Sequence, residues 1–153
     1  MTYTARFSEQ WELLDTIYGD AVAAATESNT GVILLANYVR TVIIIHPVDV
    51  NDALDVDIEQ ATTATGALST FDAGAKDITV ATADTKPSVI EIRHEEFAAG
   101  YEYLNVEVTT ANTGGNGNEF VVEVWGEPVY KPAATTNLDS VTGRAEAAAD
   151  GYR

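Results

Sequence analysis

The sequence predicts an all-β domain, a β-sandwich or jelly-roll-like fold of about eight or nine short strands. Apolar and polar side chains alternate with a period of two in several segments, among them residues 54–59 and 104–109. Such alternation is typical of strands that have one buried and one wet face. Clusters of Gly, Pro, Asn and Asp separate these segments, as the short connections of a sandwich require.

The first 20 residues are expected to form an N-terminal arm with a short helix over residues 9–18. Ser8 is a suitable cap, and Gly19 is a suitable end. The larger apolar side chains fall on one side of this helix, at helical spacing. They are Trp11, Leu14, Ile17 and Tyr18. The helix would pack either on its own sandwich or on a neighbouring subunit, and these four residues are candidate interface residues.

Residues 38–46 are apolar on both faces, which predicts a central strand covered from both sides. One cover is the opposite sheet, and the other is either the N-terminal helix or a partner subunit. Further candidate interface residues are therefore Tyr38, Arg40, Val42 and Ile44. Farther along, residues 94–100 suggest a single helical turn. The glycine-rich residues 113–118 suggest the tip of a hairpin between two long strands.

The sandwich is expected to span residues 21–130, followed by an extended or disordered arm over residues 131–153. The arm has few large apolar residues and cannot bury enough surface to fold alone. It would either remain disordered or become ordered along a neighbouring subunit, and Tyr130 and Lys131 at its start complete the candidate interface.

The charge balance restricts the partners. The 153 residues include 8 Lys and Arg against 24 Asp and Glu, a formal net charge of −16. Phosphate backbones and anionic lipid surfaces should repel such a chain, so neither nucleic acid nor a membrane is an expected partner. No basic and apolar leader precedes the domain and no apolar run is long enough to cross a bilayer, so we expect synthesis in the cytoplasm of a host cell.

The sequence offers little chemistry, and we expect neither an enzyme nor a cofactor. It has no cysteine and only two histidines, His46 and His94, without metal-binding spacing. Nucleophile-elbow and phosphate-loop motifs are absent. Two binding functions stay open. The acidic series Asp49, Asp52, Asp55, Asp57 and Glu59 could supply calcium ligands, although it departs from EF-hand order. Aromatic residues could line a sugar platform if several share an outward face, namely Tyr101, Tyr103, Trp125 and Tyr130.

The order of segments resembles small virion-associated structural proteins of tailed bacteriophages. The segments that carry this resemblance are residues 3–9, 38–42, 55–62, 89–97, 100–108 and 130–133. The resemblance implies a capsid decoration (cement) protein on the capsid surface of the virion, bound to the major capsid protein or other virion subunits as a trimer or other homo-oligomer. The alternative is another virion component, namely a tail, neck or fibre-base protein. No functional residue is carried over with it.

Overall fold

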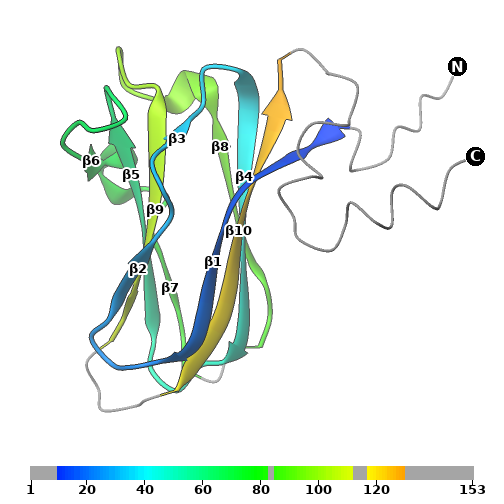
Figure 1. Cartoon of the computed structure of the whole chain (residues 1–153), viewed down its shortest axis with the longest axis vertical. Helices are drawn as coiled ribbons and strands as arrows, with labels where there is room; N and C mark the ends of the chain where they lie inside the picture. Colours follow the sequence, from blue (N-terminus) through cyan, green and yellow to red (C-terminus); the bar gives the residue numbers. More distant parts are fainter. Residues whose placement is uncertain (1–9, 83–84, 112–116, 130–153) are drawn as a thin grey trace, which may run out of the picture.

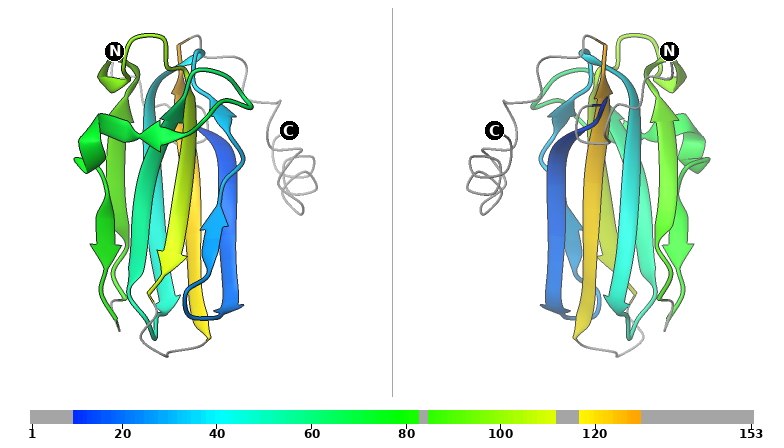
Figure 2. Two further views of the ribbon diagram at one scale, coloured as in Figure 1. Left: turned by 90° about the vertical axis from the view of Figure 1, so that its left-hand side faces the viewer. Right: turned by 90° about the vertical axis from the view of Figure 1, so that its right-hand side faces the viewer.

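The computed structural model describes residues 10–82, 85–111 and 117–129. Within them the chain forms two antiparallel sheets that face each other as a sandwich (Figures 1 and 2). The strands are β1 (Glu12–Val22), β2 (Glu27–Asn29), β3 (Ile33–Leu34), β4 (Tyr38–Asp49), β5 (Leu54–Ala61), β6 (Ser69–Thr70), β7 (Ile78–Val80), β8 (Ser88–Arg93), β9 (Tyr103–Thr110) and β10 (Asn118–Pro128). The all-β prediction is confirmed.

Sheet A has the order β1-β10-β4-β8, and sheet B has the order β2-β9-β5-β6 with β3 and β7 as further short strands. Besides the helical residue Gln10, the helical elements in the described part of the chain are the 3-10 turns η1 (Phe71–Gly74) and η2 (His94–Glu96). The second turn confirms the expectation for residues 94–100. No helix among these residues is long and apolar enough to span a membrane.

The core lies between the sheets and follows from the alternation in the sequence. Inward side chains of β5 and β9 meet those of β4 and β10, and most are fully buried. The inward residues of these four strands are Ile43, Ile45, Leu54, Val56, Ile58, Leu104, Val106, Val108, Phe120, Val122 and Val124. Burial of this apolar surface, at about 25 cal/mol per Å², is the main stabilising term of the fold.

The N-terminal helix was predicted wrongly, because residues 12–22 form strand β1 along β10. A register shift between Leu13 and Asp15 inserts Leu14 as an extra residue in the strand. This β-bulge lets Leu14 and Ile17 both pack inward although they are three positions apart, which imitates helical spacing. Gly19 does not end a helix; it lies within β1 beneath the ring of Phe120.

The hairpin prediction for residues 113–118 was also wrong. The strand before this connection, β9, belongs to sheet B, whereas β10 after it belongs to sheet A, between β1 and β4. The connection therefore crosses from one sheet to the other, and residues 112–116 themselves lie outside the described part. The predicted arm at residues 131–153 is likewise outside it.

Strand β4 is central, as residues 38–46 predicted, with β10 on one side and β8 on the other. Its inward residues Ile43 and Ile45 are fully buried, whereas Val42 and Ile44 on the outer face are half-buried. Within the described residues no helix covers this outer face, which Figure 2 shows in its right-hand view.

Candidate functional site

The outer face of sheet B is acidic. Glu107 of β9 lies directly opposite Asp57 of β5 in the antiparallel register, and Asp55 and Glu59 flank Asp57 on the same face of β5. Burial, followed by the charges of Asp77, Asp55 and Glu59, raises the pKa of Asp57 above its ordinary value. Burial, followed by the charges of Glu27 and Glu59, raises the pKa of Glu107. This face repels anionic partners, and it also repels the same face of another copy of the chain.

The outer face of sheet A carries six apolar side chains around Glu123 of β10 and His46 of β4, whose side chains lie 3.6 Å apart. Cross-strand pairing sets Val42 opposite Trp125, Ile44 opposite Val89, and Tyr18 opposite Val121. Two of these side chains are strongly exposed, Tyr18 at 76% and Val89 at 63%. The other four are half-buried. We call these six residues the sheet A patch. A group of apolar side chains on one outer face, two of them strongly exposed, is typical of an interaction surface.

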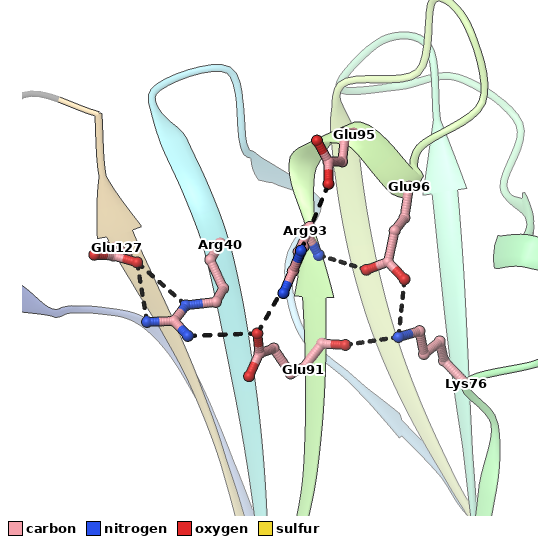
Figure 3. A network of polar contacts seen from close by, with 7 residues as sticks. All are labelled: Arg40, Lys76, Glu91, Arg93, Glu95, Glu96 and Glu127. Carbon is pink, nitrogen blue, oxygen red and sulfur yellow. Dashed lines mark hydrogen bonds and ion pairs between the residues drawn. The ribbon is translucent and has the colours of Figure 1, made fainter.

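One end of the sheet A patch carries an ion-pair network around Arg40 (Figure 3). The Arg40 guanidinium contacts the Glu127 carboxylate at 3.1 Å and the Glu91 carboxylate at 3.4 Å. On one face it is covered by the ring of Trp11, whose centroid lies 4.8 Å from the guanidinium carbon. Arg93 adds longer contacts, 3.9 Å to Glu91 and 3.7 Å to Glu95. Both arginines are therefore compensated and do not form an anion site.

Lys76 joins this network to the edge of sheet A. Its ammonium lies 3.0 Å from the Glu96 carboxylate and donates a hydrogen bond of 2.9 Å to the backbone oxygen of Glu91 in β8. Glu96 also accepts the backbone N–H of Arg93 at 2.6 Å. That backbone hydrogen bond, with the help of Lys76, lowers the pKa of Glu96. These contacts fix η2 against the end of β8.

A shallow open groove lies beside the network, with a volume of about 640 Å³. Its lining residues are Ala36, Tyr38, Val39, Arg40, Arg93, His94, Glu95, Glu127 and Val129. His94 lines this groove, but its Nδ1 is buried without a hydrogen-bond partner, and its ring stacks on Phe97.

The predicted interface residues separate into two groups. Ile17 is buried in the core, and Leu14 and Tyr38 pack against it, so these three do not form an outer surface. Burial, with a hydrogen bond to Glu12, raises the pKa of Tyr38. In contrast, Tyr18, Arg40, Val42 and Ile44 do lie together on the outer face of sheet A, with Trp11 over Arg40. Tyr130 and Lys131 are outside the described residues.

The proposed calcium ligands do not converge. Asp49 is exposed at the end of β4, Asp52 is fully buried in the following turn, and Asp55, Asp57 and Glu59 follow the outer face of β5. Among the described residues no group of three or more acidic or histidine side chains could hold a metal ion. The expected sugar platform fails for a similar reason, because Tyr103 belongs to sheet B and Trp125 to sheet A.

Sequence reasoning missed Asn118, a buried residue that fastens one end of the sandwich. Its side-chain oxygen accepts the backbone N–H groups of Asn51 at 2.9 Å and Asp52 at 2.8 Å. Its amide nitrogen donates to the backbone oxygen of Val22 at 3.2 Å. The alternation in the sequence indicates this role, because Asn118 falls on the same inward face of the strand as Phe120 and Val122. A polar side chain buried there needs hydrogen-bond partners.

No protein-family model and no curated protein matches the sequence. Among solved structures, a Bacillus endospore appendage that forms disulfide-linked pili aligns over 84% of this chain and 99% of its own, with 12% identity and a TM-score of 0.38. Tailspike protein 4 of bacteriophage CBA120 aligns over 78% of this chain and 20% of its own, with 11% identity and a TM-score of 0.46. A family 11 carbohydrate-binding module of Clostridium thermocellum aligns over 86% of this chain and 95% of its own, with 11% identity and a TM-score of 0.37. Likenesses this distant do not indicate what the chain binds.

Proposed function

We propose that the chain is a structural, non-catalytic subunit of a tailed-bacteriophage virion, a capsid decoration protein that docks through the outer face of sheet A. The single observation that carries the docking surface is the contrast between the two outer faces. Sheet A presents the sheet A patch around Glu123, with the ion pairs of Arg40 at one end, whereas sheet B presents a row of carboxylates. Apolar surface gives binding energy on burial, and the acidic face is left to solvent.

The resemblance of the sequence segments to virion-associated proteins supports the phage assignment. A decoration protein stabilises the assembled shell by binding it and not its separated subunits, through mass action. Many copies on a lattice add avidity to modest individual contacts. A tail, neck or fibre-base position would use the same surface, and electron microscopy of whole particles separates these positions.

Val89→Glu tests the docking surface. Val89 is 63% exposed on the edge strand β8, opposite Ile44 of the sheet A patch. A charge there should not disturb folding, but it would have to be buried on docking. We expect the binding of the variant to purified particles to weaken by about tenfold or more in co-sedimentation, a loss of about 1.4 kcal/mol.

Leu68→Glu is the matched control. It adds the same charge at an apolar residue that is 41% exposed, just before β6 of sheet B. Loss of binding in Val89→Glu but not in Leu68→Glu supports the proposed surface. Equal effects of the two substitutions, or none in either, would reject it.

A carbohydrate-binding module is the second candidate, and one observation favours it. Tyr18, 76% exposed, shares the outer face of sheet A with Trp125. Aromatic rings have an apolar body and a polar end, which suits a ligand that is partly apolar and partly hydroxylated. Calorimetry with a panel of soluble glycans would show heat that is lost in Tyr18→Ala if this candidate is correct, and no heat with any glycan if it is wrong.

A further inference from the structure

A carboxylate lies within the sheet A patch. Glu123 of β10 is opposite Ile44 of β4 in the antiparallel register. Val121 and Trp125 lie two residues to either side of Glu123, on the same face of the strand. The Glu123 side chain is 32% exposed, so water reaches it in the free protein. A partner that docks on the patch would remove much of this water, and a carboxylate that loses water needs a cation or hydrogen-bond donors in exchange.

The contacts of Glu123 with its neighbours use one of its two oxygens. Trp125 donates its indole N–H to the Oε2 of Glu123 at 3.1 Å, and the Nε2 of His46 lies 3.6 Å from the same oxygen. The indole carries no charge, and His46 compensates the carboxylate only when its ring is protonated. Within the described residues both contacts go to Oε2, so Oε1 can accept a donor from a docked partner.

Two other carboxylates on this face have an arginine partner within the chain. Arg40 contacts the Glu127 carboxylate at 3.1 Å and the Glu91 carboxylate at 3.4 Å. Among the described residues neither an arginine nor a lysine forms an ion pair with Glu123. Glu123 therefore lacks, within this part of the chain, the permanent cation that Glu91 and Glu127 share.

The surroundings of Glu123 suit an arginine side chain better than a metal ion. Arginine can lay its apolar stem on apolar side chains while its guanidinium donates to a carboxylate. Ile44 lies beside Glu123, and Val89 lies beyond Ile44 on the next strand, so both could contact such a stem. A metal ion would need several ligands at one point, and no acidic or histidine group of that kind exists among the described residues.

We propose that the surface docked on the sheet A patch presents an arginine side chain that pairs with Glu123. This inference rests on the proposed docking and adds the chemistry of the partner. The guanidinium donates to Oε1, while Oε2 keeps the indole N–H of Trp125. The pair gives the docking its specificity, because a neutral or acidic partner surface would leave the Glu123 carboxylate buried without a cation.

Glu123→Gln tests the pair in co-sedimentation with purified particles. Glutamine has nearly the shape of glutamate and keeps an oxygen for the Trp125 indole, but it carries no charge. We expect this variant to bind particles more weakly than the natural chain by about tenfold or more. Glu107→Gln is the matched control, because it removes one carboxylate from the outer face of sheet B. It should bind particles as the natural chain does.

The direction of the change in affinity decides between the alternatives. If no cation of the partner meets Glu123, docking buries an uncompensated charge, and Glu123→Gln should bind as tightly as the natural chain or more tightly. That result would overturn the inference and leave the docking surface in place. Equal weakening in Glu107→Gln would also overturn it, because the effect would then be one of overall charge. If the natural chain itself does not bind particles, the proposed docking and this inference are both wrong.

An NMR titration of the free protein provides a measurement without particles. The indole N–H of Trp125 reports on Glu123 because it bonds to that carboxylate, and Trp11→Phe distinguishes its resonance from that of the other tryptophan. The probe is N-acetylarginine methylamide, and its control is the uncharged citrulline analogue. We expect the Trp125 resonance to shift with the arginine probe, but neither with the citrulline probe nor in Glu123→Gln. Equal shifts with the two probes, or no shift with either, would contradict the inference.

Discussion

Gly19→Ala should destabilise the protein, although replacing glycine in a strand normally has the opposite effect. A Cβ at position 19 would lie 2.7 Å from both Cδ1 and Cζ of Phe120 and would also meet Cε1. That ring is 1% exposed and packed in the core, so it has little space to move. Overpacking of this kind typically costs about 1–3 kcal/mol. Alanine also restricts the unfolded chain more than glycine does, which stabilises the folded state by only about 0.4–1 kcal/mol.

We therefore expect a net loss of about 1–2 kcal/mol in the free energy of unfolding, measured by urea denaturation. Gly31→Ala is the control, because the nearest atom to its new Cβ is the Asp15 carboxylate oxygen at 3.7 Å. It should be neutral or slightly stabilising. A Gly19→Ala variant as stable as the natural protein would refute the placement of Phe120 over β1.

Three other predictions concern single side chains. Asn118→Ala should lower the free energy of unfolding, measured by urea denaturation, by about 2–4 kcal/mol, because it leaves buried backbone groups of the β4–β5 turn without hydrogen-bond partners. A loss below about 0.5 kcal/mol would contradict that role of Asn118. Asp57→Asn should raise stability at pH 7 by a few tenths of a kcal/mol after solvent screening. Because the pKa of Asp57 is raised in the folded state, its charged form opposes folding. The gain in stability should therefore vanish below about pH 3.5, where Asp is protonated in both the folded and the unfolded states. A gain that persists at that pH would contradict this explanation. Arg40→Met should cost less than about 1 kcal/mol by thermal denaturation, because its ion pairs are partly exposed, and a larger loss would show that the network is stronger than its geometry implies.

The sequence predicted the sandwich because its central strands follow simple alternation. In β5 and β9 every second residue is buried, with Ala61 and Asn105 buried in addition, and that alternation indicates strands. The first strand was misassigned because a bulge at Leu14 shifts the parity of the strand, and alternation cannot reveal an inserted residue. Pairing partners were not predictable either, since glycine-rich residues before β10 serve equally well as a hairpin tip and as a crossover between sheets.

The candidate site was partly predictable. Val42 and Ile44 signalled an apolar outer face because they interrupt the alternation of β4 with apolar residues where polar ones are expected. The network of Arg40 with Glu91 and Glu127 was not predictable, because it joins residues from three strands whose neighbour order the sequence does not specify. For the same reason, the separation of Tyr103 from Trp125 onto different sheets became visible only in the structure.

A cryo-electron map of tailed-phage particles in which mass spectrometry detects this chain tests the central claim most directly. The proposed docking predicts that the outer face of sheet A, with Tyr18 and Val89, is turned toward neighbouring subunits of the particle. The carboxylates of sheet B around Asp57 would then face solvent. A map in which sheet B contacts the shell, or in which the outer face of sheet A remains fully exposed on a bound subunit, would contradict it.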